Sequence, residues 1–187
     1  MFERGFKAWC ERYSTSIRVE LGLSKDKPLD TRALAKHLNI KVWSPKDVPG
    51  LDKECLDVLL RNDGKRASCW SAVTLVQGTK TLVILNTSHS LARQASDLTH
   101  ELAHRIRQHS AQEVSVSEEG LMLLKSYDKL QEEEADWLSA CLLLPRESLV
   151  SIRKRHLENS LAAAEYGVSL RMLTYRMATS GVDRQFR

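Results

Sequence analysis

Apolar side chains recur every three to four positions over residues 5–22, which predicts an amphipathic helix near the start of the chain. After a polar break, Asp30 or Thr31 is suited to cap a short helix. A small strand is predicted over residues 40–43. Residues 51–60 follow neither the helical nor the strand period clearly, so their pattern leaves both structures open.

Two β-rich runs, residues 71–76 and 81–85, are joined by a short turn around Gly78, which predicts a hairpin. A helix is predicted to follow directly and to run to about residue 109. Its apolar residues form one stripe, the predicted core face, made of Leu91, Ala95, Leu98, Leu102 and Ile106. The histidines of this helix lie off that stripe, so they are not simply core residues.

The rest of the chain reads as a loop over residues 110–120, a short helix over 121–130, and a longer helix ending before Pro145. Further helices follow, with a break at residues 166–169. These patterns predict a mainly helical α+β fold with a small, mostly antiparallel sheet or hairpin before the histidine-bearing helix. We expect a core over residues 1–145 and a helical C-terminal segment over 146–187, packed together as one compact domain.

Composition narrows the classes of protein. The 187 residues are 42% hydrophobic, which suits one compact domain, and the net charge of +4 permits an anionic partner without demanding one. The charged N-terminus does not resemble a secretory signal, and no apolar run approaches the roughly 20 residues that span a bilayer. The four cysteines are far apart and favour reduced thiols over a zinc knuckle. We therefore expect a cytoplasmic protein that is not attached to a membrane.

The most informative motif is His-Glu-Leu-Ala-His at residues 100–104. His100 and His104 are four residues apart, so on a helix they point the same way and can hold one zinc ion. Glu101 is placed to take a proton from water at that metal and to return it to the leaving amine of a cut peptide bond. The alternative role for Glu101 is a surface ion pair with Arg105.

A catalytic zinc ion usually has three protein ligands, and the motif supplies two. We predict Glu132 as the third ligand, with Glu133 as the fallback. Asp136 lies on the same helical face as Glu132 and is predicted to accept the second N–H of a ligating histidine. The alternative is that this acidic run is only a solvated helix start.

Other histidines lack ligand spacing. His109 lies five residues beyond His104 and is predicted to face elsewhere, near the helix C-terminus. His89 and His156 are weaker candidates still.

Two further features of the site remain open. Because peptidases often bind substrate as an added strand beside a sheet edge, residues 81–85 are a candidate edge strand, although a core strand is equally consistent. The group that stabilises the oxyanion is not identified, and Tyr127, Tyr166 and Tyr175 are all candidates.

Together with segments elsewhere in the chain, this motif makes the sequence resemble the ImmA/IrrE family of metallo-endopeptidases. The resemblance covers most of the chain, and the segments that carry it are 4–9, 29–40, 83–86, 92–94 with the motif itself, 132–145 and 168–176. Ala103 stands where glycine is common in the family, and Trp137 and Ser139 alter the second helix. None of these three differences removes a ligand.

The resemblance implies a zincin-like protease with one catalytic Zn²⁺, bound by His100, His104 and Glu132, and with Glu101 as the catalytic glutamate. Family members typically act in the bacterial or phage cytosol, where they cleave or otherwise inactivate a helix-turn-helix repressor. The resemblance therefore implies a protein substrate, a repressor or antitoxin encoded nearby. Stress response, mobile-element induction and toxin–antitoxin-like pairs are the settings it suggests.

Two rival interpretations use the same residues. The C-terminal segment has a helix, a turn containing Gly167 and a second helix with Arg171 and Arg176, as in a DNA-binding helix-turn-helix, and residues 153–155 could contact phosphate. The modest charge excess instead favours two packed helices, so direct nucleic-acid binding is possible but not favoured. The other rival is a zinc-containing module that binds a regulator without cleaving it.

Overall fold

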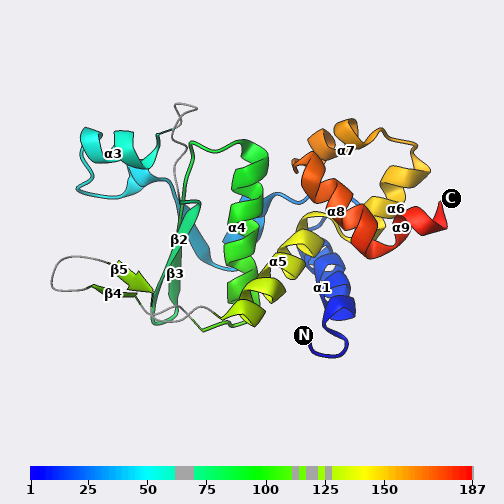
Figure 1. Cartoon of the computed structure of the whole chain (residues 1–187), viewed down its shortest axis with the longest axis horizontal. Helices are drawn as coiled ribbons and strands as arrows, with labels where there is room; N and C mark the ends of the chain where they lie inside the picture. The colour runs from blue at the N-terminus through cyan, green and yellow to red at the C-terminus, as the bar shows by residue number, and fades with distance from the viewer. Residues whose placement is uncertain (62–69, 111–113, 117–121, 125–127, 187) are drawn as a thin grey trace.

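The computed structural model describes residues 1–61, 70–110, 114–116, 122–124 and 128–186. It confirms a mainly helical α+β fold. Helix α4 (Leu91–Ile106) stands between a small sheet on one side and the C-terminal helices on the other (Figure 1). Within the described residues, no helix is long and apolar enough to cross a membrane.

The N-terminal elements follow the predicted pattern. Helix α1 spans Phe6–Glu20, helix α2 spans Thr31–His37, and strand β1 spans Ile40–Trp43. The Asp30 carboxylate caps α2 by accepting the backbone N–H groups of the first turn. A 3₁₀ turn, η1 (Pro45–Asp47), follows, and the ambiguous segment forms helix α3 (Lys53–Leu59).

The sheet has three strands in the order β1-β3-β2, so β3 (Lys80–Leu85) is the central strand. Strand β2 (Ala72–Gln77) pairs antiparallel with β3, which confirms the predicted hairpin, and β1 pairs parallel with β3. Of the two interpretations left open for residues 81–85, the core strand is therefore confirmed and the edge strand is excluded. Strand β2 is the edge strand on the hairpin side, because β1 occupies the other side of β3.

Helix α4 begins at the Ser90 cap and buries Leu98 and Leu102 in the core. The predicted apolar stripe is wrong at its first residue, since Leu91 is 83% exposed. Helix α4 packs against the sheet and, along the other side, against helix α5 (Lys129–Leu143), which in turn packs on α1. This layering places the two long helices side by side.

The segment before α5 differs from prediction. Strands β4 (Val114–Val116) and β5 (Met122–Leu124) pair antiparallel, in regions where a loop and a short helix were expected. Helix α5 starts at Lys129, capped by Asp128. A short apolar run does not reveal its structure by periodicity alone, and here strand pairing decides it.

The C-terminal segment contains four helices, α6 (Arg146–Lys154), α7 (Asn159–Glu165), α8 (Leu170–Ser180) and α9 (Val182–Gln185). These helices surround their own apolar cluster, which includes Ile152, Leu173 and Met177. Leu143, the last residue of α5, and Leu144, its C-cap, belong to the same cluster. Helix α5 thus links the two apolar cores, while the division into segments at residue 145 stays a prediction.

Two buried arginines hold the C-terminal end of α5. Arg18 on α1 donates to the carbonyl oxygens of Leu142 and Leu143, at 2.8 and 3.2 Å. Arg176 on α8 donates to the carbonyl oxygen of Leu144 at 3.0 Å. The last carbonyls of a helix have no partner within it, so these guanidinium groups satisfy them and fix the position of α5.

Candidate metal centre

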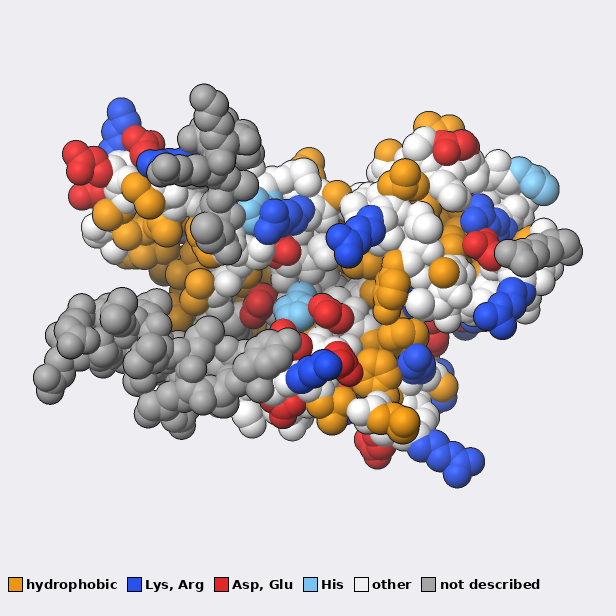
Figure 2. Space-filling model, viewed as in Figure 1, with side chains coloured by type: hydrophobic (Ala, Val, Ile, Leu, Met, Phe, Trp, Pro, Cys, Tyr) orange, Lys and Arg blue, Asp and Glu red, His pale blue; other side chains and the backbone are white. Residues whose placement is uncertain are grey.

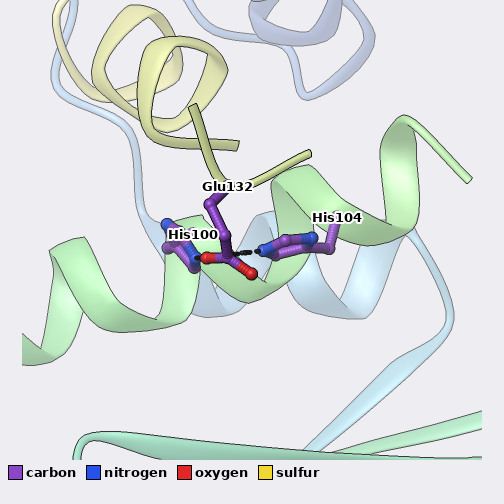
Figure 3. A group of neighbouring side chains, drawn as sticks. All are labelled: His100, His104 and Glu132. Carbon is purple, nitrogen blue, oxygen red and sulfur yellow. Dashed lines mark hydrogen bonds and ion pairs between the residues drawn. The ribbon is translucent and has the colours of Figure 1, made fainter. Parts of the chain in front are cut away.

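The packing of α4 against α5 brings together all three residues predicted as metal ligands. His100 Nε2 lies 3.2 Å from the Glu132 carboxylate, and His104 Nε2 lies 3.7 Å from it. The two Nε2 atoms are 3.0 Å apart. Figure 3 shows the Glu132 carboxylate reaching from α5 to the space between the two imidazoles of α4. Within the described residues, these three form the group able to hold a metal ion.

The spacing of these atoms fits a tetrahedral zinc ion. Zinc–ligand distances of about 2.0–2.1 Å place neighbouring ligands of a tetrahedron roughly 3.3 Å apart. The three distances between the ligand atoms, 3.0, 3.2 and 3.7 Å, lie on both sides of that value. Two nitrogens and one oxygen are also a donor set that catalytic zinc sites use. The residues present therefore fit zinc.

Asp136 orients His100 for this role. Its carboxylate oxygen lies 3.0 Å from His100 Nδ1, and because a carboxylate only accepts, Nδ1 must carry the proton. Binding of a metal ion requires Nε2 to be deprotonated, and His100 would then present this lone pair toward Glu132 and His104. Burial alone would lower the pKa of His100, but the hydrogen bond and charge of Asp136, with smaller contributions from Glu101 and Glu132, raise it.

His109 contacts His104, so the prediction that it faces elsewhere is wrong. The Nδ1 atoms of the two imidazoles are 2.9 Å apart, and His109 Nε2 lies 3.2 Å from the Glu134 carboxylate. Helix α4 ends at Ile106, and Gln108 adopts a left-handed conformation with φ of 56°. That change of chain direction turns His109 back toward the helix. Its backbone N–H donates to the backbone carbonyl of His104.

The hydrogen-bond partners of His109 also determine which ring nitrogen of His104 carries the proton. Glu134 only accepts, so a neutral His109 donates from Nε2 and accepts at Nδ1. His104 must then donate from Nδ1, which leaves its Nε2 lone pair directed at Glu132. Burial, and then the charge of His100, lower the pKa of His104 to about 4, which keeps the imidazole neutral. When both Nε2 atoms are deprotonated, their lone pairs converge at 3.0 Å and suit a bound cation.

Glu134 was not predicted to belong to the site, although its neighbours were. It is buried, and Arg107 donates to it at 2.9 Å. Its spacing could have indicated a separate role. Glu134 lies two residues from Glu132 and therefore on a different side of α5. The acidic run thus places Glu132 beside His100 and His104, while Glu134 contacts the far side of His109.

Glu101 contacts the sheet rather than Arg105. The hydroxyl of Thr74, on the edge strand β2, donates to the Glu101 carboxylate at 2.5 Å. No ion pair joins Glu101 to Arg105 among the residues that the structure describes. Glu101 is next to His100 in the chain, so the helix and the edge strand together place this carboxylate beside the ligand group.

None of the remaining candidates that the structure describes belongs to the group of His100, His104 and Glu132. His89 is buried against Asp97, and His156 is exposed. Glu133, the fallback ligand, is exposed and pairs with Lys129. Tyr166 is buried and donates to the carbonyl of Asp26 at 2.7 Å, so its hydroxyl is already used. Tyr127 lies outside the described residues, and Tyr175 lines a cavity that His100 also borders.

This arrangement can bind a metal ion and hold a carboxylate base beside it. Metal-dependent hydrolases use these two groups to activate water. The chain matches the sequence model of peptidase family M78, described as the IrrE N-terminal-like domain, over residues 59–178. The match includes the histidine motif, Glu132 and most of the C-terminal helices. Among curated proteins, nothing matches the chain. Since more than half of the chain is covered, the protein belongs to the IrrE N-terminal-like family of metallopeptidases.

Proposed function

We propose that this protein is a zinc-dependent endopeptidase of the bacterial or phage cytosol. The observation that carries the proposal is the convergence of His100, His104 and Glu132, with Glu101 on the same helix. Membership of a metallopeptidase family supports the same reaction. Composition supports it further, because no long basic block or membrane segment points to another class.

The proposed mechanism assigns one role to each residue. His100, His104 and Glu132 would hold the ion, while Asp136 and His109 fix the imidazole orientations. A bound zinc ion supplies a Lewis acid for the peptide carbonyl and makes water easier to deprotonate. Glu101 takes the proton from the attacking water and delivers it to the leaving amine. The Thr74 hydroxyl holds the Glu101 carboxylate in place.

The edge strand β2 is the proposed guide for the substrate chain. On its outer side, β2 has no strand partner among the described residues, and Val73 and Leu75 are about half exposed. An extended peptide can add to such an edge through main-chain hydrogen bonds. Thr74 of the same strand contacts Glu101, so a peptide on β2 would run past the metal centre.

The proposed substrate is a regulatory protein, a helix-turn-helix repressor or antitoxin encoded near this gene. The support is the resemblance to the ImmA/IrrE family, whose members typically act on such regulators. The test incubates the product of the neighbouring repressor-like gene with the zinc-loaded protein and with its Glu101→Gln variant. Cleavage by the wild type alone supports the proposal. Binding by both without cleavage favours the regulator-binding module instead.

The metal assignment has a separate test. Zinc content per folded protein should fall on changing His100, His104 or Glu132 to alanine, and should persist in Glu101→Gln. Unchanged zinc in all three alanine variants would overturn the ligand set.

DNA binding by the C-terminal helices is the second alternative, and the placement of their arginines weighs against it. Arg176 is 1% exposed and bonded to Glu11 and Leu144, so it is not free to contact phosphate. Arg171 lines the cavity beside His100. Salt-sensitive retention of DNA by the isolated protein would nevertheless favour this alternative.

A further inference from the structure

A cavity of about 500 Å³ lies between α4, α5 and α8 and is bordered by His100. Asp97 contributes from α4, Asp136 from α5, and Arg171 and Tyr175 from α8. Figure 1 shows α8 beside α4 and α5, on the opposite side of α4 from the sheet. The helix that resembles a DNA-recognition helix therefore turns part of its polar surface toward the metal centre.

The acidic groups of this cavity are already engaged. The Asp97 carboxylate lies 3.4 Å from His89 and 3.6 Å from Arg93. Asp136 accepts from His100. Figure 2 shows acidic side chains around a histidine in the middle of this face, with Lys and Arg side chains nearby.

Two donors of the cavity, both on α8, are not engaged. Within the described part of the chain, the Arg171 guanidinium has no hydrogen bond or ion pair, and the Tyr175 hydroxyl has no hydrogen bond. Burial raises the pKa of Tyr175, so the hydroxyl keeps its proton, and the ring packs on Trp137 with centroids 6.3 Å apart. A cation and a hydroxyl that both lack an acceptor suit a ligand that carries a carboxylate.

We infer that this cavity is a substrate subsite for an acidic side chain, Asp or Glu, close to the scissile bond. Arg171 pairs with the carboxylate, and Tyr175 is placed to donate to it. The inference rests on the proposed peptidase function, because His100 borders both the cavity and the site where the peptide bond would be cut. Helix α8 would then form one side of a subsite that determines the specificity of the protease.

Binding to the cavity can be measured without catalysis. The probe is N-acetyl-glutamate N-methylamide, with its glutamine analogue as the neutral control, titrated into ¹⁵N-labelled, zinc-loaded, full-length Glu101→Gln protein. We expect amide shifts at residues 171–175 with the acidic probe only.

Adding the Arg171→Gln change should weaken binding of the acidic probe about fivefold, the size of one partly exposed ion pair. Adding Arg184→Gln instead, on α9, should leave binding unchanged, since Arg184 does not line the cavity. Equal binding of both probes, or shifts confined to other regions, would overturn the subsite.

A cleavage profile tests the same subsite in turnover. Wild-type protein acting on a proteome-derived peptide library should favour Asp or Glu at one fixed position near the cut. Arg171→Glu should exchange that preference for Lys or Arg, while Arg184→Glu should keep it. Cleavage without an acidic preference would contradict the subsite and leave the peptidase standing. If no peptide is cleaved, the peptidase proposal is contradicted, and the binding titration still decides the subsite.

Discussion

The imidazole of His109 lies against that of His104, with their Nδ1 atoms 2.9 Å apart. Glu134 holds the far side of His109 at 3.2 Å and also accepts from Arg107. His100 is held by a carboxylate without an intervening residue, because Asp136 accepts directly from its Nδ1. Each of the two proposed histidine ligands is thus oriented by a carboxylate of α5, one directly and one through a third histidine.

Replacing His109 with leucine should weaken zinc binding. His104 would lose the acceptor for its Nδ1–H, and the loss of such a support typically costs about 10- to 100-fold in metal affinity. Competition with a chromogenic chelator measures the affinity. His37→Leu is the control, since His37 pairs with Glu20 away from the centre. Zinc affinity equal to wild type in a folded His109→Leu protein would show that His109 does not support the ligand.

Replacing Thr74 with valine should lower turnover without loss of zinc. The change removes the hydroxyl that donates to Glu101 while keeping a β-branched side chain on the edge strand. We expect kcat to fall about tenfold, a part of the 10²–10⁴ that a positioned general base contributes. Thr74→Ser restores a hydroxyl and should recover most of the rate. If valine and serine variants were equally slow, the hydroxyl would not be the cause.

Replacing Tyr166 with phenylalanine should affect stability and not catalysis. The change removes the hydrogen bond from the buried hydroxyl to the carbonyl of Asp26. The free energy of unfolding should fall by about 1 kcal/mol, measured by urea denaturation. The specific activity of the folded protein should stay at the wild-type value. A large loss of kcat would instead return Tyr166 to the oxyanion candidates.

Much of the fold and ligand group follows from local sequence patterns. Helix α4 places His100 and His104 on one face because four residues make about one turn, and that geometry needs no tertiary information. Glu132 and Asp136 have the same relationship on α5. Strand β1 and the hairpin β2–β3 were predictable because their apolar runs end at clear turns.

The features that sequence patterns missed depend on contacts between distant segments. The edge of the sheet is decided by β1, which pairs with β3 although some 40 residues separate them. His109 was misplaced because a helical projection beyond Ile106 assumes a helix that has already ended. The burial of Glu134 likewise depends on Arg107 and His109, which are 27 and 25 residues away in the chain.

Replacing Arg176 with methionine should destabilise the protein substantially. Arg176 is 1% exposed, donates to Glu11 at 2.6 Å, and satisfies the carbonyl of Leu144 at the end of α5. Methionine fills a similar volume but leaves both acceptors without this donor. Removing one partner from such a buried network typically costs about 3–5 kcal/mol, and the Glu11 side chain is still one quarter exposed, so we expect about 3 kcal/mol.

Urea denaturation of the full chain measures this loss. Arg184→Met on α9 is the matched control and should change the free energy of unfolding by less than about 0.5 kcal/mol, because Arg184 is exposed. Glu11→Gln should lie between the two, since its single amide oxygen can still accept from Arg176, whereas the backbone N–H of Arg146 loses its carboxylate acceptor. If Arg176→Met were as stable as the control, the end of α5 would be held by Arg18 and apolar packing alone. The hydrogen bond from Arg176 of α8 to the carbonyl of Leu144 would then not stabilise the position of α5, the helix that carries Glu132.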